Sequence, residues 1–463
     1  MSASRHWSWA ARIAFFCLLS SAAGAGSAAA AGLFDAAGAA DARTAAAQAA
    51  PSDPQAVRNR LVRVNAGELA RHVVPAGLDK STQRVARARQ LDGVVQIELF
   101  PGTILNLRRT DVSANADGGY VWAGQSDEKT FHEALLIVEN GKISGRVQMH
   151  DRLFRIDHVS GAVHRITELN SQQFPPEAPP RVAPPAAGQS GSSTQAPDAV
   201  APNAVAKVKV RVLVAYTTAA QSRSPNINTE ISQAISLANQ AYTRGNIPIV
   251  LELAGKMRPA YNENAGYEQN LTDLTSGASL KSVRTRRASL RADLAVLLRR
   301  SGEFCGIAWL PPNGGSPAMP RPSAATRETG YSIVGRDCIT NLSFHHELGH
   351  NMGLNHDRYV SSQAANNVYN YGYVNRAERI RTIMAYNNDC AARGFNCPRV
   401  NYFSSPTVRA QPGNVLVGKA QNASGAADNT RRLREIRNLI GNYYPPPAAD
   451  TQTEAATADA SAE

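Results

Sequence analysis

Three of the four histidines in the stretch HHELGHNMGLNHD, residues 345–357, and its glutamate stand at helical and near-helical offsets. His346 and His350 are four residues apart, so on a helix their imidazoles share one face and can bind a single metal ion. Glu347 follows the first of them and can direct its carboxylate at a water in the open position of that ion. This HExxH arrangement is typical of zinc peptidases, in which the glutamate is the general base. An ordinary polar helix is the alternative that these residues alone leave open.

The residues that follow favour the metal site. Gly353 comes three residues after His350, and glycine tolerates the positive φ that ends a helix and turns the chain. His356 can then return as a third ligand, and three nitrogen ligands with one water make the open, catalytic type of zinc site. After His164 the sequence has four histidines, all within this stretch. His345 is out of register with the other three and is expected to support the site or lie at the surface.

The complete string HExxHxxGxxH, with Asp357 directly after the third histidine, resembles the reprolysin branch of the metzincin zinc peptidases. This resemblance implies one catalytic Zn²⁺, bound by the three histidines, with structural support from Gly353 and Asp357. It also implies a methionine beneath the ligands, and Met384 in RTIMAY would supply it. Tyr386, two residues later, resembles a tyrosine that helps to stabilise the oxyanion in related enzymes; a purely structural tyrosine is the alternative.

Further segments narrow the resemblance. Together with the histidine stretch, CGIAWL (305–310), RTIMAY and CPRVNYFSSP (397–406) are similar to bacterial peptidyl-Asp metalloendopeptidases, secreted enzymes that cut on the amino side of Asp. A preference for Asp needs a cation in the substrate pocket, and arginine suits a carboxylate best because its fork binds both oxygens. Arg399 and Arg393 follow the methionine and are the candidates. A solvated surface arginine is the alternative, and it fits Arg393 better.

The first 31 residues predict a secretory signal peptide, with a basic start, a short apolar run and small residues before the cleavage point. The apolar run is too short to span a bilayer, and no later stretch does better. We therefore expect an exported protein, secreted or periplasmic, without a membrane span. Outside the signal four cysteines remain, which suggests two disulfides with three possible pairings. The expected pairs are Cys305 with Cys338 and Cys390 with Cys397.

Periodicity and composition divide the rest of the chain. Alternating strand and helix patterns, with the histidine helix among them, predict an α/β (α+β) catalytic domain with a mixed sheet, preceded by a small β-rich domain. The expected segments are an Ala-rich disordered stretch at 32–56, the β-rich domain at 57–174, an exposed Pro/Ala/Ser linker with a processing site at 175–206, the catalytic domain at 207–444 and a disordered tail at 445–463.

By resemblance the β-rich domain would be a propeptide that inhibits the enzyme until the linker is cut. It contains no cysteine, so a cysteine switch is unavailable. A carboxylate, a histidine or steric cover must keep the precursor inactive instead. Asp151 and His150 are two of several candidates that the sequence leaves open.

The charge of the chain favours anionic partners. The net charge is +12, and residues 206–445 carry 24 Arg and 5 Lys against 15 Asp and Glu, a balance of +14. An acidic protein substrate fits this charge, whereas no aromatic and basic motif indicates nucleic acid. The competing hypotheses are a metzincin of broad specificity, an inactive zinc fold used for binding, and a binder of anionic polymers. The intact Glu347 argues against the inactive fold.

Overall fold

The computed structural model describes residues 32–47, 53–65, 68, 94–115, 117–128, 131–184, 206–315, 317–362 and 365–445. The expected signal peptide, most of the expected linker and the tail from residue 446 onward lie outside these residues. None of the described helices is long and apolar enough to cross a membrane.

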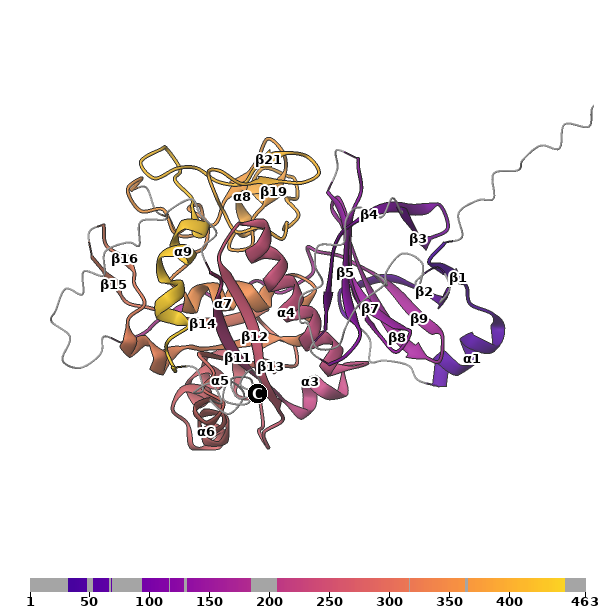
Figure 1. Cartoon of the computed structure of the whole chain (residues 1–463), viewed down its shortest axis with the longest axis horizontal. Helices are drawn as coiled ribbons and strands as arrows, with labels where there is room; N and C mark the ends of the chain where they lie inside the picture. The colour runs from indigo at the N-terminus through magenta and orange to yellow at the C-terminus, as the bar shows by residue number, and fades with distance from the viewer. Residues whose placement is uncertain are drawn as a thin grey trace, which may run out of the picture. The chain divides into compact units, whose positions relative to one another are not determined.

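The first part of the chain is a nine-stranded antiparallel sheet in the order β1-β2-β9-β8-β7-β6-β5-β4-β3 (Figure 1). Alternate side chains of its strands enter one core around Trp122 and Phe154, which are fully buried. The elements are β1 (Phe34–Ala36), α1 (Ala39–Ala47), β2 (Ala56–Val64), β3 (Val94–Phe100), β4 (Thr103–Ala114), β5 (Tyr120–Gln125), β6 (His132–Glu139), β7 (Lys142–Met149), β8 (Arg152–Ser160) and β9 (Val163–Leu169).

The prediction of disorder for residues 32–56 is wrong over much of that stretch. Phe34 pairs with Val64 at the edge of the sheet, and Leu33 and Phe34 are buried in its core. The alanines that follow form α1, as expected of the residue with the highest helix propensity. The alanine content concealed the two apolar anchors at the start of the segment.

The second part of the chain contains a six-stranded mixed sheet in the order β10-β14-β17-β13-β11-β12. Strands β11, β12, β13 and β17 are parallel to one another, whereas β14 is antiparallel to β17. The mixed α+β architecture expected from the sequence is confirmed. The strands are β10 (Arg181–Val182), β11 (Val208–Tyr216), β12 (Ile249–Met257), β13 (Leu294–Arg299), β14 (Gly306–Leu310) and β17 (Tyr331–Gly335).

Helices pack on both faces of this sheet. Val212 and Val214 of β11 belong to a core shared with α4 (Ile227–Arg244), α7 (Ser343–Asn351) and α9 (Asn429–Ile440). Leu213 and Ala215 point the other way, into a core shared with α5 (Gly266–Thr275) and α6 (Lys281–Ser289). This alternation follows from the two-residue period of a strand. It places α7, the helix of the histidine stretch, in the interior of the domain.

Short helices and strands complete the chain: α3 (Thr218–Ser222), η1 (Ala278–Leu280), β15 (Asn313–Gly314), β16 (Met319–Pro320), η2 (Ala324–Thr329), η3 (Arg336–Ile339), β18 (Val374–Asn375), β19 (Ile380–Arg381), α8 (Asn388–Ala391), β20 (Arg409–Ala410) and β21 (Val415–Leu416). The last five, from β18 to β21, lie between α7 and α9 in an irregular region that also contains Met384 and Arg399.

Residues 170–184, called here the connecting segment, join the two sheets. The prediction of an exposed linker is wrong for part of residues 175–184, because β10 pairs in parallel with β14 and Glu177, Ala178 and Ala183 are buried. The Ala178 amide donates to the Gly306 carbonyl at 2.9 Å and the Ala183 amide to the Leu310 carbonyl at 2.8 Å. The edge strand of the second sheet thus supplies the backbone partners that a Pro-rich segment cannot find within itself.

Candidate active site

Helix α7 carries the first half of the histidine stretch. All nine of its residues are buried, including His346, Glu347 and His350. The two histidines are one turn apart, so their rings point to the same side of the helix, with centroids 4.8 Å apart. A helix buried on every side holds these polar groups away from bulk water, which strengthens any electrostatic interaction they make.

A sharp turn after α7 brings the third histidine back. Gly353 has φ +83°, and a side chain there would place its Cβ 2.9 Å from the Pro320 carbonyl oxygen, so glycine is required twice over. Beyond the turn, His356 Nε2 lies 3.1 Å from His346 Nε2 and 2.9 Å from His350 Nε2. The three histidines that the sequence proposed as ligands therefore converge on one point.

The hydrogen bonds of these rings fit a metal ion. His346 Nδ1 donates to the Ile383 carbonyl at 2.9 Å, and His350 Nδ1 donates to the Leu354 carbonyl at 2.8 Å. Each bond fixes the tautomer, so the facing Nε2 atoms carry lone pairs rather than protons. Burial, and next His350, lower the pKa of His346 well below its ordinary value, and burial lowers the pKa of His350 to about 4. Neutral nitrogens that face one another in this way repel unless a cation lies between them.

Glu347 lies beside this cluster and is fully buried. Neither of its carboxylate oxygens accepts a hydrogen bond from a donor among the described residues. Gly306 of β14 makes room for it, because a Cβ at that position would be 2.4 Å from a carboxylate oxygen. Burial, and next the carboxylate of Glu177, raise the pKa of Glu347 well above its ordinary value. A buried carboxylate without a donor is suited to take a proton from a water molecule.

Met384 and Asp357 support the parts of the chain that carry the histidines: Met384 packs on α7, and Asp357 bonds to the backbone after His356. A Cβ on Gly349 of α7 would be 2.7 Å from the Met384 sulfur, so this glycine allows the thioether to pack directly on the helix. The Asp357 carboxylate accepts hydrogen bonds from the Tyr386 amide at 2.8 Å and the Tyr359 amide at 3.0 Å. Asp357 thereby ties the chain that follows His356 to the backbone of Tyr386.

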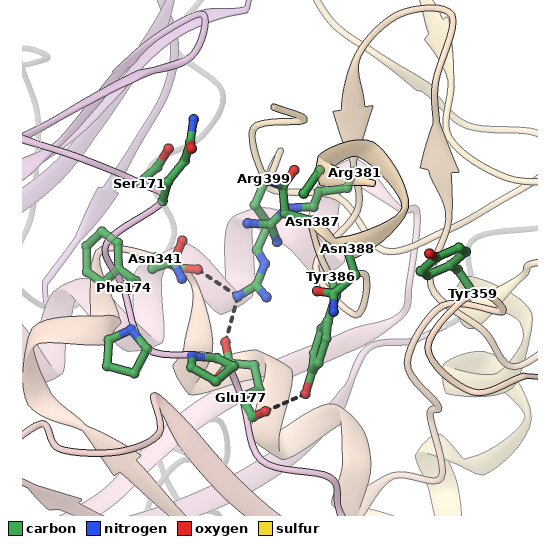
Figure 2. A pocket seen from close by; sticks show the side chains of 14 residues that line it. Ser171, Phe174, Glu177, Asn341, Tyr359, Arg381, Tyr386, Asn387, Asn388 and Arg399 are labelled. Carbon is green, nitrogen blue, oxygen red and sulfur yellow. Dashed lines mark hydrogen bonds and ion pairs between the residues drawn. The ribbon is translucent and has the colours of Figure 1, made fainter. Parts of the chain in front are cut away.

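Tyr386 faces the cluster through its ring. The ring centroids of Tyr386 and His356 are 4.2 Å apart. Its hydroxyl donates to the backbone carbonyl of Glu177 at 2.6 Å, as Figure 2 shows. Burial, and next the Glu177 carboxylate, raise the pKa of the Tyr386 phenol, which keeps it protonated and able to donate.

A cavity of about 490 Å³ lies beside Tyr386 and contains the candidate specificity arginine, Arg399. Arg381, the first residue of RTIMAY, lines the same cavity, and both arginines are 6% exposed (Figure 2). We call this cavity the arginine pocket. Its walls are Asn341, Arg381, Tyr386 to Asn388, Ala391 and Arg399 on one side, and Ser171, Gln172 and Phe174 to Glu177 of the connecting segment on the other, with Tyr359 at its edge.

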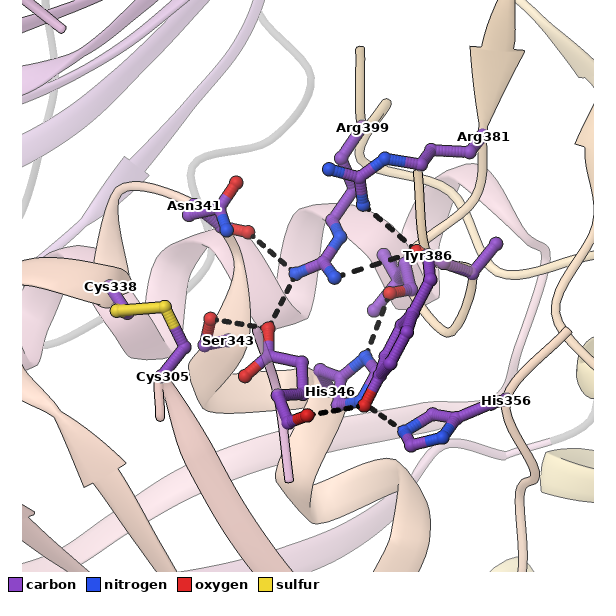
Figure 3. Close-up of polar contacts among 12 residues, drawn as sticks. Cys305, Cys338, Asn341, Ser343, His346, His356, Arg381, Tyr386 and Arg399 are labelled. Atoms are coloured by element: carbon purple, nitrogen blue, oxygen red, sulfur yellow. Dashed lines mark hydrogen bonds and ion pairs between the residues drawn. A yellow bond between two sulfur atoms is a disulfide. The ribbon is translucent and has the colours of Figure 1, made fainter. Parts of the chain in front are cut away.

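Glu177 enters the arginine pocket from the connecting segment. Its Oε1 accepts a charge-assisted hydrogen bond from Arg399 Nη1 at 2.8 Å and another from the Ser343 hydroxyl at 2.7 Å. Arg399 Nη1 also donates to the Asn341 carbonyl at 3.0 Å, which directs the guanidinium toward the start of α7 (Figure 3). The pocket and the histidine cluster are thus adjacent, with Tyr386 between them.

The structure places the remaining candidates elsewhere. Arg393 is exposed and pairs with Asp389 one helical turn away, so it takes no part in the pocket. His345 is buried and bonds through Nε2 to the Asn401 side chain at 2.9 Å, away from the cluster. Asp151 and His150 occupy the exposed turn between β7 and β8.

The two disulfides are those expected, Cys305–Cys338 and Cys390–Cys397. The first joins the start of β14 to η3, just before α7 (Figure 3). It therefore links the edge strand that receives the connecting segment to the helix that carries His346.

Three residues of the site were missed by sequence reasoning: Glu177, Arg381 and Ser343. Each lies far from the others in the sequence and meets them through the fold. A signal for Glu177 existed, because it is the one acidic residue between Glu168 and Asp198 and it stands between two proline pairs in PPEAPP. Arg381 belongs to the motif that identified Met384, but nothing in the sequence indicates which way its side chain points.

Comparison with known proteins agrees with this site. Residues 202–412 match the model of the reprolysin-like metallopeptidases of family M12B. Peptidyl-Asp metalloendopeptidases of Stenotrophomonas maltophilia strains R551-3 and K279a and of Xanthomonas campestris pv. campestris are 29%, 28% and 26% identical to the chain. The alignments cover 86%, 86% and 92% of this chain and 95%, 95% and 96% of those proteins.

The family match includes α7 and the turn that returns His356, and the three alignments continue through most of the first sheet. The histidine cluster and these matches lead to one conclusion: the chain is a metalloendopeptidase that is similar to the reprolysin-like metallopeptidases over residues 202–412.

Proposed function

We propose that the chain is the precursor of an exported zinc endopeptidase that hydrolyses peptide bonds on the amino side of aspartate. One observation supports this proposal most strongly. Glu347 is a buried carboxylate that accepts no hydrogen bond from the described residues, and it lies near three convergent histidines and a pocket with two buried arginines. The name of the relatives supports the preference for Asp.

The residues divide the chemistry among them. His346, His350 and His356 would hold the zinc ion, whose Lewis acidity would polarise the substrate carbonyl and make a water molecule more acidic. Glu347 takes a proton from the attacking water and later passes it to the leaving amine. Tyr386 donates a hydrogen bond from its hydroxyl to the oxygen on which negative charge develops.

The arginine pocket would bind the side chain of the residue after the cut. Arg399 already holds a carboxylate there, that of Glu177, at 2.8 Å. The planar guanidinium can bind the two oxygens of an aspartate at once, and the Asn341 carbonyl holds it in place. Specificity for an acidic side chain follows because a neutral one would leave the buried guanidinium without a counter-ion.

The first sheet would serve as the propeptide, with cleavage in the part of the linker at residues 185–205. The predicted signal peptide would direct the precursor out of the cytoplasm. The positive charge of the second domain would favour the approach of acidic protein substrates.

The test is digestion of a defined protein by the processed enzyme. The chain without its first 31 residues would be purified, allowed to complete linker processing, and incubated with substrate with and without a zinc chelator. New N-termini would be sequenced by mass spectrometry. A Glu347→Gln chain, processed in the linker by the wild-type enzyme and purified from it, is the control for contaminating proteases.

Each outcome has a distinct meaning. Chelator-sensitive cuts with Asp at the new N-terminus would support the proposal. Chelator-sensitive cuts at mixed residues would retain the metalloendopeptidase and reject the Asp preference. An absence of cleavage by the processed wild-type chain would reject the proposed activity in favour of a binding role.

A further inference from the structure

The connecting segment delivers one acidic side chain to the arginine pocket. Among the described residues, Glu177 is the carboxylate that an ion pair joins to Arg399. The guanidinium of Arg381 donates to the carbonyls of Cys397 at 2.9 Å and Ala385 at 2.8 Å, so its hydrogen-bond partners among the described residues are all neutral. The pocket therefore contains two positive charges and one negative charge.

We propose that Glu177 is an internal mimic of the acidic substrate side chain, and that it keeps the precursor inactive by occupying the arginine pocket. The inference rests on the proposed function, since it takes the pocket to be the site of substrate aspartate. It identifies the residue that closes the pocket, for which the sequence left several candidates open.

The backbone around Glu177 is fixed on both sides. The Cys305 amide donates to the Pro176 carbonyl at 2.8 Å, and the Ala178 amide donates to the Gly306 carbonyl at 2.9 Å. Proline pairs precede and follow this stretch and restrict φ, so the extended segment loses little conformational entropy when it binds. The segment thus presents the carboxylate without depending on the ion pair alone for its conformation.

The ion pair is suited to release. The contact uses one arm of each group, Oε1 of Glu177 and Nη1 of Arg399, and Nε of Arg399 has no hydrogen-bond partner among the described residues. A buried ion pair of this kind adds little net stability, because desolvation offsets much of the attraction. Glu177 therefore fills the pocket while the segment is attached, and a substrate carboxylate can take its place once the linker is cut.

The same residue covers the catalytic groups. The backbone carbonyl of Glu177 engages the Tyr386 hydroxyl, the donor that would otherwise serve the developing oxyanion. Pro176 and Ala178 bond to Cys305 and Gly306, at the start of β14 and next to Glu347. A substrate cannot reach these groups while the segment is in place.

The first experiment measures whether the charge of Glu177 holds the segment. Hydrogen–deuterium exchange would be followed at the amides of Ala178 and Ala183 in the full chain without its signal. The chain would carry Glu347→Gln to prevent self-processing. Glu177→Gln should raise exchange about 10- to 100-fold, the range expected when a charge-assisted hydrogen bond is lost. Glu177→Asp, which keeps the charge but is shorter, should have a smaller effect.

The matched control is Glu168→Gln. Glu168 also bonds to two partners, Arg58 and Arg152, and it lies nine residues before Glu177, but it does not contact Arg399. This variant should leave exchange at Ala178 and Ala183 unchanged. Equal acceleration in both variants would mean that loss of any carboxylate loosens the region, and it would overturn the proposal.

A second arm distinguishes the pocket from the metal site. If Glu177 acts through Arg399, the effect of Glu177→Gln on exchange should persist in the presence of a zinc chelator. An effect that disappears on chelation would place the carboxylate on the metal ion instead and would overturn the proposed contact.

Activity measurements separate this proposal from the proposed function. With Glu347 intact, the unprocessed Glu177→Gln precursor should cleave an Asp-containing peptide at least about 10-fold faster than the wild-type precursor. After linker processing the two enzymes should be identical, because residue 177 has been removed. If the processed enzymes cut before Asp but the two precursors are equally inactive, Glu177 is not the latency residue. If the processed enzymes do not cut at all, the proposed function fails, and the exchange data still report the contact.

Discussion

The histidine cluster and the arginine pocket both bury nitrogen atoms, but the histidines are neutral and the arginines are charged. His346, His350 and His356 are neutral and face one another through Nε2 atoms 2.9–3.1 Å apart, an arrangement that suits a metal ion. Arg381 and Arg399 are permanently charged, and Arg399 is paired with an anion, the carboxylate of Glu177. The two sites lie on either side of Tyr386, so one chain offers adjacent places for a metal ion and for a carboxylate.

This difference in charge determines whether each site can exist without its binding partner, the metal ion or the carboxylate. Histidines can lose or gain protons, so a metal-free cluster remains tolerable at neutral pH. Arginine cannot neutralise itself, and a buried guanidinium without a counter-ion is costly. The arginine pocket therefore needs a carboxylate at each stage, from Glu177 in the precursor and from the substrate afterwards.

The largest effect is expected at Glu347, which should act on water without holding the ion. Glu347→Gln should lower kcat about 10³-fold, because the amide cannot accept the proton. Metal content should be unchanged, since the three histidines supply the ligands. Peptide hydrolysis and atomic emission of the purified enzyme would measure the two quantities. The exposed Glu378→Gln is the control, and a Glu347→Gln enzyme with near-normal turnover would exclude the general-base role.

The next effect belongs to the arginine pocket alone. Arg399→Met keeps an apolar stem of similar length but removes the guanidinium. It should lower the ratio of kcat/KM for an Asp peptide to that for the matching Asn peptide about 100-fold, with metal content unchanged. Arg393→Met removes an exposed arginine that pairs with Asp389 and should leave the ratio unaltered. An unchanged cleavage profile in Arg399→Met would show that the pocket does not set specificity.

The histidines, unlike the arginines, should make stability depend on pH. Burial lowers the pKa of His350 to about 4 and that of His345 to about 3. The unfolded chain, with ordinary histidines near pH 6.5, binds protons first as the pH falls, so stability is complete above that pH and is lost toward pH 4. From pH 7 to pH 5 the free energy of unfolding of the metal-free chain should fall by about 2 kcal/mol for each such histidine.

Urea unfolding of the chelated chain, followed by tryptophan fluorescence, would measure this slope. The Arg393→Met chain should show the same slope, because this exposed arginine does not titrate in this range and pairs with Asp389. If the metal-free wild-type chain were equally stable at pH 7 and pH 5, these histidines would not be buried in the neutral form.

The two sites also differ in how far the sequence predicted them. The metal cluster is formed by residues within eleven consecutive positions, because one helix and one glycine turn suffice to bring His346 and His356 together. The arginine pocket is assembled from the connecting segment, the start of α7 and two later loops, and local periodicity carries no information on such long-range contacts. Arg399 was identified only through its position after Met384, and Glu177 was hidden by a composition that indicated a linker.

The fold shows the same division. Strands β3 to β9, β11 to β13 and β17 follow from their alternation and from buried runs such as Leu294–Arg299, and the mixed sheet follows from the order of strands and helices. The β-strand pairing of residues 181–182 does not, since a proline-rich segment forms a strand here only because β14 offers it an edge. Burial of Phe34 likewise depends on a partner strand more than twenty residues away.

The smallest effect is expected at Tyr386, which touches both sites. Tyr386→Phe keeps the ring that stacks near His356 and the amide that bonds to Asp357, and it removes only the hydroxyl. If the hydroxyl stabilises the oxyanion, kcat in the processed enzyme should fall about 5-fold, the value of one neutral hydrogen bond, while KM and the Asp preference stay constant. Tyr359→Phe, at an exposed tyrosine on the edge of the pocket, is the matched control. A Tyr386→Phe enzyme with full kcat would make this tyrosine a structural residue, and the link between the two sites would then exist only in the precursor, through the carbonyl of Glu177.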